Sequence, residues 1–121
     1  MTILDMPTEA YGIPPAGWQG MSIPQHTADT LENYLLKGWE PGGFVTACLA
    51  GDLFRAVATA DVENRKHLWA IVTWIGNFAP ASSWGSYEAV VAWVRDENER
   101  RSKWAISKEK EFTWRALKGY E

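Results

Sequence analysis

The side chains that could carry out chemistry in this sequence are few and lie far apart. There are two histidines, His26 and His67, and a single cysteine, Cys48. The zinc-ligand spacings Cys-x-x-Cys and His-Glu-x-x-His do not occur, nor does a Gly-x-Ser-x-Gly nucleophile turn or a phosphate-binding loop. These patterns predict no catalytic residue, no metal site and no cofactor, and hence a protein that is not an enzyme.

The same three residues have structural interpretations. Cys48 lies in the apolar run 44–49 without a neighbouring histidine to activate a thiolate, so we expect a small buried side chain. One cysteine allows no intrachain disulfide, which suits a reducing cytosol. His26 directly precedes the first expected helix, where a structural role is favoured. His67 follows two basic residues and is expected on a solvated helix face.

Asp61, Asn64 and Arg65 form the most concentrated polar group. Asp61 is a good helix cap, and Arg65 follows it by four residues, so the two side chains can face each other across one turn. A cap with an ion pair is the structural interpretation. The functional interpretation is a polar cluster that contacts a partner.

Two short segments could bind a phosphate or a base. Gly42 and Gly43 could present backbone N–H groups at a helix start, although a simple turn explains the pair as well. Trp84 precedes Gly85 and the capping residue Ser86, so a nucleobase could stack on the indole while its phosphate meets the helix. The alternative is a tryptophan in the core beside a capping serine.

Aromatic content gives the strongest indication of function. Eight tryptophans occur in 121 residues: Trp18, Trp39, Trp69, Trp74, Trp84, Trp93, Trp104 and Trp114. Each buried indole covers roughly 150–250 Å², and a small domain cannot enclose all of them. Some are therefore expected at the surface, where tryptophan is typical of a binding contact. Trp39, in the turn 38–43, is the clearest surface candidate.

Composition excludes several classes. The net charge of −3 and the pI near 5.4 argue against general nucleic-acid binding. No apolar stretch approaches the roughly 20 residues of a membrane span, so no membrane contact is expected. The segment 95–121 mixes both charge signs with Trp104, Phe112 and Trp114. It is either a solvated helix or an interaction arm.

Hydrophobic spacing predicts an all-α protein: a compact bundle of five or six short helices, with an irregular N-terminal arm and a helical C-terminal extension. The arm is residues 1–24, the core domain is 25–94 and the charged extension is 95–121. Expected inward residues include Leu31, Tyr34 and Leu35, and also Leu53, Phe54 and Val57. The expected helices are approximately 27–37, 44–49, 53–60, 62–78, 87–100 and 107–118.

The block from Ile23 to Val94 resembles a family of small uncharacterised phage-encoded proteins. The matching elements are Ile23-Pro24-Gln25-His26-Thr27, Pro41-Gly42-Gly43-Phe44, Gly51-Asp52-Leu53, Ala60-Asp61-Val62-Glu63-Asn64-Arg65 and Trp84-Gly85-Ser86. The resemblance implies a phage or prophage accessory protein acting in the cytoplasm of the infected bacterium. It implies no activity residue by residue.

These observations together predict a non-enzymatic protein that binds and inhibits a host bacterial protein, with defence factors as the first class of target. One alternative is a homo-oligomer that sequesters a nucleotide immune signal, such as a cyclic nucleotide. A second alternative is a structural or assembly protein of the virion. The predicted partner- or ligand-binding residues are Trp39, Gly42, Gly43, Asp61, Asn64, Arg65, Trp84, Trp104 and Trp114.

Overall fold

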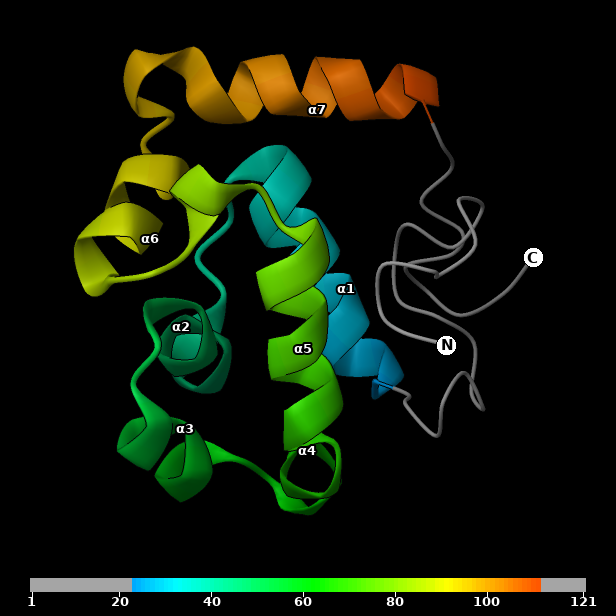
Figure 1. The fold of residues 1–121 in the computed structure, drawn as a ribbon, viewed down its shortest axis with the longest axis vertical. Helices are drawn as coiled ribbons and strands as arrows, with labels where there is room; N and C mark the ends of the chain where they lie inside the picture. Colours follow the sequence, from blue (N-terminus) through cyan, green and yellow to red (C-terminus); the bar gives the residue numbers. More distant parts are fainter. Residues whose placement is uncertain (1–22, 112–121) are drawn as a thin grey trace.

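The structure, a computed structural model, describes residues 23–111 of the chain, and the side chains of Phe78 and residues 106–111 are not described. Within this range there are seven α-helices, two short 3₁₀ segments and no strand, so the all-α prediction is confirmed (Figure 1). The expected arm 1–24 lies almost wholly outside the described residues, as do Trp18 and Trp114. The elements are α1 (Gln25–Lys37), α2 (Gly42–Ala50), α3 (Leu53–Thr59), α4 (Val62–Lys66), α5 (Leu68–Phe78), η3 (Ala81–Ser83), α6 (Tyr87–Val94), η4 (Glu97–Glu99) and α7 (Arg100–Glu111).

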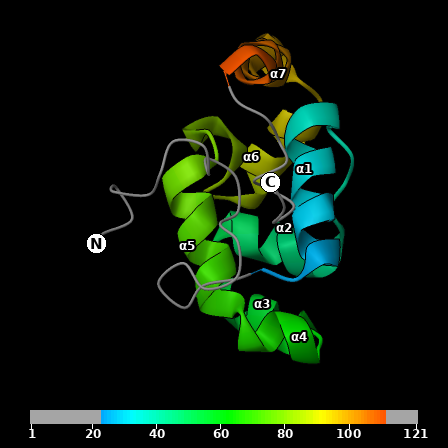
Figure 2. The same cartoon turned by 90° about the vertical axis from the view of Figure 1, so that its right-hand side faces the viewer.

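The central element is α2, which contacts α1, α3, α5 and α6. Its sequence, GGFVTACLA, has no charged residue, and a helix that is apolar all round is expected in a core. Figure 2 shows α2 between α1 and α5, with α7 across the top of the bundle. The prediction of a buried helix at 44–49 is therefore confirmed, and Val45, Ala47 and Leu49 are buried.

Aromatic packing joins α1, α6 and α7. Tyr34 and Trp93 are buried, and their ring centroids lie 6.4 Å apart. The Tyr34 hydroxyl donates to the Ser83 carbonyl at 2.8 Å, and the Trp93 indole N–H donates to the Tyr34 carbonyl at 3.2 Å. The Trp104 ring meets Trp93 edge-on at 5.9 Å, which fixes α7 on the bundle through an indole contact.

The predicted single helix 62–78 is wrong, because the chain breaks at His67 into α4 and α5. His67 has φ −114° and ψ 17°, and its N–H bonds back to Asn64 three residues earlier. The break separates a polar segment, VENRK, from an apolar one, LWAIVTWIGNF. It lets α4 turn toward the start of α1 while α5 runs through the core (Figures 1 and 2).

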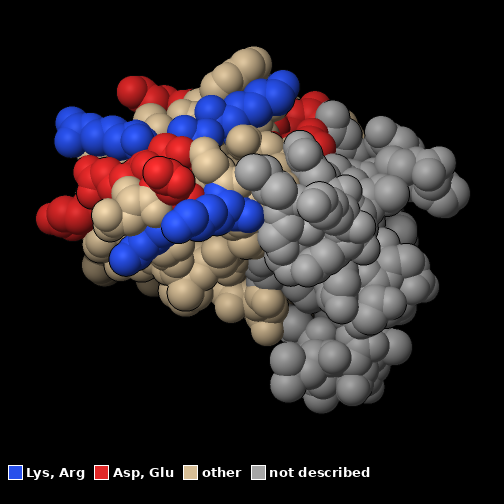
Figure 3. All heavy atoms as spheres, turned by 90° about the horizontal axis from the view of Figure 1, so that it is seen from above, with Lys and Arg blue, Asp and Glu red and all other residues tan. Residues whose placement is uncertain are grey.

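The predicted helix 87–100 is also too long, and the last helix starts at Arg100 rather than near 107. Asp96, Asn98 and Glu99 all have positive φ, which ends helical geometry. The Asp96 carboxylate accepts hydrogen bonds from the backbone N–H and the hydroxyl of Ser102, so it caps the first turn of α7. Seen from above, the described part of the molecule carries acidic and basic side chains intermixed (Figure 3), as expected of a solvated surface.

Cys48 is buried, as predicted, and burial raises the pKa of its thiol to about 12. We therefore expect Ellman's reagent to react slowly at pH 8 with the folded protein and quickly with the urea-unfolded chain, whose thiol has a pKa of about 8.5. The labelling rate should follow the unfolded fraction as urea is raised. Labelling as fast in native buffer as in urea would contradict the buried placement.

Candidate functional site

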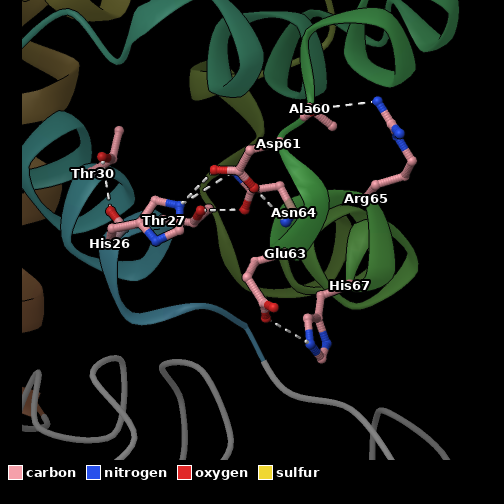
Figure 4. Close-up of polar contacts among 9 residues, drawn as sticks. All are labelled: His26, Thr27, Thr30, Ala60, Asp61, Glu63, Asn64, Arg65 and His67. Atoms are coloured by element: carbon pink, nitrogen blue, oxygen red, sulfur yellow. Dashed lines mark hydrogen bonds and ion pairs between the residues drawn. The ribbon is translucent and has the colours of Figure 1, made fainter.

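Two of the three residues predicted as a polar cluster, Asp61 and Asn64, do meet, and together with His26 they join two helices. Asp61 caps α4 by accepting the Asn64 backbone N–H at 2.7 Å, and its other oxygen lies 3.3 Å from His26 Nε2. The Asn64 amide nitrogen lies 3.5 Å from the same ring nitrogen. Figure 4 shows these side chains converging from the starts of α1 and α4.

Thr27 completes this cluster; the sequence makes it a plausible N-cap of the first helix, but α1 begins at Gln25 and the cap position is Pro24. Its hydroxyl donates to Asn64 Oδ1, and both side chains are buried. A hydroxyl that is 1% exposed cannot reach a substrate from solvent, so the Thr27–His26–Asp61 arrangement does not offer a nucleophile. The cluster holds α4 against α1 across 37 residues of sequence.

The predicted Asp61–Arg65 ion pair is not formed. The Arg65 guanidinium instead donates to the Ala60 carbonyl at 3.2 Å and points away from the cluster (Figure 4). Asp61 is already oriented by the Asn64 N–H and by His26, which turns its carboxylate to the other side. The cap half of the structural interpretation is confirmed, and the ion-pair half is wrong.

The variant Asn64→Ala tests whether the Thr27–Asn64 hydrogen bond stabilises the contact between α4 and α1. It removes the acceptor of a buried hydroxyl, and we expect a loss of about 1–3 kcal/mol in the free energy of unfolding by urea titration. Lys66→Ala, on the exposed side of the same helix, is the control and should change stability by about 0.5 kcal/mol or less. Equal effects of the two variants would show that the Thr27–Asn64 bond contributes nothing.

The other predicted segments are distributed over the bundle. Gly42 and Gly43 are the first residues of α2, whereas Gly85 bonds to the Leu49 carbonyl near the end of that helix. Trp84 is half-buried against the core and its indole N–H donates to the Ala79 carbonyl at 3.3 Å, which agrees with the core interpretation. Ser86 caps α6 as predicted, accepting the Ala89 N–H at 3.0 Å. Within one chain, the glycine pair and Trp84 therefore do not share a pocket.

The six tryptophans in the described range fall into three groups. Trp74 and Trp93 are buried, Trp84 and Trp104 are half-buried, and Trp39 and Trp69 are 57% and 64% exposed. Trp39 is the surface residue that its turn predicts, with the Lys37 ammonium 4.9 Å from its ring. Trp104 is a packing residue of α7. Trp69 is the exposed indole that the sequence reasoning missed.

Trp69 belongs to a set of large apolar side chains exposed on three consecutive helices. We name this set the α3–α5 apolar surface; its members are Leu53, Phe54, Val57, Val62, Trp69 and Val72. The prediction that Leu53, Phe54 and Val57 point inward is wrong, since Phe54 alone is 87% exposed. Helix α3 has seven residues and buries only Ala56. Small side chains let it approach α2 closely and leave its large ones outside.

A small apolar groove adjoins two members of this surface, Leu53 and Val72. It holds about 100 Å³ and is lined by residues of α2, α3 and α5, among them Leu53, Ala56, Leu68 and Val72. Small-molecule pockets measure roughly 300–1,000 Å³, so this groove suits one apolar side chain better than a cofactor. The sequence did contain a signal for this exposure, namely large residues that are adjacent at 53–54 and at 68–69. Adjacent side chains of one short helix point in different directions, so the helix cannot bury both.

A second polar group joins the start of α3 to the start of α6. Tyr87 donates to Asp52 Oδ2 at 2.6 Å, and Arg55 donates to the Tyr87 hydroxyl at 3.2 Å. The Tyr87 hydrogen bond, followed by the Arg55 backbone N–H, lowers the pKa of Asp52 below its usual value. Asp52 also caps α3 through that N–H at 3.2 Å.

Asp52→Asn tests the pH dependence that follows. The pKa of Asp52 is lower in the folded state than its unfolded value of about 3.9. Ionised Asp52 therefore stabilises the fold at pH values above about 3.9, and this stabilisation is lost as the pH falls through the folded-state pKa. Asparagine keeps the cap but does not titrate. We expect the variant to lose less stability than wild type as the pH falls below about 4, measured by thermal unfolding. Equal losses in the variant and in wild type would contradict this role of Asp52.

Comparisons with protein-family models, with curated proteins and with solved structures gave no significant match for this chain. Among the described residues, no three His, Cys, Asp or Glu side chains are grouped to hold a metal ion. The same part of the chain contains no helix with both the length and the apolar character to span a bilayer.

Proposed function

We propose that this chain is a non-enzymatic phage accessory protein that binds and inhibits a host bacterial protein through the α3–α5 apolar surface. The observation that carries the proposal is the exposure of six large apolar side chains on three consecutive helices. Phage origin and the host target rest on the family resemblance of residues 23–94. A defence factor in the cytoplasm of the infected cell is the class of target that this origin favours.

The energetics of exposure support a binding role. Burying a large apolar side chain contributes about 1.5–3 kcal/mol, and this surface leaves several such side chains in water. Phe54 and Trp69 are the residues with the largest area to gain, and aromatic side chains are enriched among binding hot spots. The partner we infer presents an apolar segment that inserts one aliphatic or aromatic side chain into the groove beside Leu53 and Val72.

The test uses capture from bacterial lysate with matched variants of the full chain. Wild type should retain one stoichiometric partner, and the activity of that partner should fall on binding. Phe54→Glu and Trp69→Glu should each weaken capture about tenfold or more, because a hot-spot side chain is lost and a charge faces an apolar contact. Trp39→Glu, an equally exposed tryptophan outside this surface, is the control and should bind as wild type.

Two outcomes would overturn this proposal. Recovery of no stoichiometric partner would remove the binding role, and loss of the partner in Trp39→Glu alone would move the interface elsewhere. Light scattering of the purified protein decides whether a second copy covers the surface: a dimer that Phe54→Glu dissociates would replace the host partner with self-association.

A homo-oligomer that sequesters a nucleotide is the second candidate. Gly42 and Gly43 line a cavity of about 450 Å³, large enough for such a ligand. Arg65 and Trp84 are not among its described lining residues, so they would have to come from other subunits. Isothermal titration with cyclic nucleotides separates the candidates, because a pure protein binder gives no heat.

A further inference from the structure

The cavity beside Gly42 and Gly43 has features that the proposed protein-binding role does not use. It holds about 450 Å³ and lies between the start of α2, Arg55 of α3 and one face of α6. Its volume falls within the roughly 300–1,000 Å³ typical of small-ligand pockets. Its lining combines an aliphatic wall with two arginines.

The aliphatic wall is a row of three valines on α6. Val90 is buried, Val94 is half-buried and Val91 is 45% exposed at the cavity. The lining residues that the structure describes include no aromatic ring, and Trp84 lies elsewhere. The wall therefore suits an aliphatic body and offers no stacking surface for a nucleobase.

Arg55 is held in place at one side of this cavity. The Tyr87 hydroxyl accepts from its Nη1 at 3.2 Å, and Asp52 in turn fixes that hydroxyl at 2.6 Å. Its Nη2 lies 3.9 Å from the position a Cβ on Gly43 would occupy, so the guanidinium sits over the first turn of α2. Among the described residues, Asp52 attracts Arg55 through charge but lies beyond the Tyr87 hydroxyl, and no direct ion pair engages the guanidinium, which leaves N–H donors for a ligand.

Arg95 lies at the end of α6 and lines the same cavity. Its side chain is exposed and has no hydrogen-bond or ion-pair partner among residues 23–111. Among the described lining residues, Glu40 supplies the one carboxylate against the two arginines. Each guanidinium group can match the oxygens of a carboxylate or phosphate.

We propose that this cavity binds a small organic anion, with its carboxylate or phosphate head between Arg55 and Arg95 and a short aliphatic body on the valine wall. The Gly42 and Gly43 side of the cavity carries no side chain, so the head can approach the backbone there. The site is separate from the α3–α5 apolar surface.

The test is a titration of the isotope-labelled full chain followed by amide chemical shifts. The probes are hexanoate and hexyl phosphate, which also tell which head group is preferred. Hexanol lacks the charged hydrogen bonds to the arginines, and inorganic phosphate lacks the apolar contact with the valines, so each should bind at least about tenfold more weakly than hexyl phosphate. Saturable shifts are expected at Gly42, Gly43 and Val91.

Variants make the result decisive. Arg95→Gln removes a side chain without a described partner, so folding is preserved, and it should weaken binding of both probes about tenfold. Glu40→Gln should strengthen binding, and Lys66→Gln and Phe54→Glu should leave it unchanged. The proposal is overturned if shifts are absent or do not saturate, if Arg95→Gln binds as wild type, or if AMP binds where hexyl phosphate does not. Because Phe54→Glu affects only the protein surface, failure here is distinguishable from failure of the proposed function.

Discussion

Trp93→Ala is expected to lower the free energy of unfolding by about 3–5 kcal/mol, the usual cost of deleting a buried tryptophan ring. Trp93 is 2% exposed and lies against Tyr34 on one side and Trp104 on the other. Its removal opens a cavity between α1, α6 and α7 and removes the ring that anchors the last helix. Small domains have a total free energy of unfolding of about 5–15 kcal/mol, so this variant would lose a large fraction of it.

Two further variants make the Trp93 result interpretable. Trp69→Ala deletes the same side chain at an exposed position and should change stability by about 0.5 kcal/mol or less. Trp93→Phe keeps part of the ring and loses the indole donor, but the Tyr34 carbonyl still accepts the Gly38 N–H at 3.0 Å. It should therefore cost less than the alanine variant. Urea titrations of all three proteins measure these differences, and similar losses in Trp93→Ala and Trp69→Ala would refute this placement of the core.

Gly38→Ala is expected to cost about 2–4 kcal/mol for two reasons that act together. Gly38 ends α1 with φ +72°, a conformation that costs an alanine about 1–2 kcal/mol. An added Cβ would also lie 2.5 Å from Arg101 Cζ. Arg101 donates to the Trp93 carbonyl at 3.0 Å and to the Val94 carbonyl at 3.3 Å, so moving it loosens the junction of α6 and α7.

The matched control for this variant is Gly76→Ala. Gly76 lies in α5, and no neighbouring atom comes within 4 Å of the position an added Cβ would occupy, so alanine should be neutral or stabilise by up to about 1 kcal/mol. A double-mutant cycle with Arg101→Ala isolates the contact, because the cost of Gly38→Ala should fall to its backbone component once the guanidinium is gone. Thermal and urea unfolding provide the measurement. An unchanged cost in the Arg101→Ala background would show that the contact does not contribute.

The fold was largely predictable from the sequence because its helices obey local rules. Apolar spacing placed Leu31, Tyr34 and Leu35 in the core, and all three are buried. Asp61 and Ser86 were each predicted as caps, and each accepts a backbone N–H three residues on. Capping and helical spacing involve neighbours within a few residues, so the sequence contains the whole interaction.

The candidate site was less predictable, since it depends on which face of each helix meets another helix. Leu53, Phe54 and Val57 have the composition of a core face, yet α3 packs through Ala56 and leaves them exposed. Asn64 was expected in a polar cluster, but its bond to Thr27 spans 37 positions and gives it a role in packing. Arg55 and Arg95 were not selected, and they meet at one cavity only after α3 and α6 pack around α2.

The amino-acid sequence by itself determined the helical class, the caps at Asp61 and Ser86, and the expectation of indoles in water, which Trp39 and Trp69 meet. Tertiary structure alone decided which apolar side chains stay outside and which charges share a cavity. The physical reason is range: caps and periodicity act over one helical turn, whereas exposure and cavity lining depend on contacts between segments far apart in the chain.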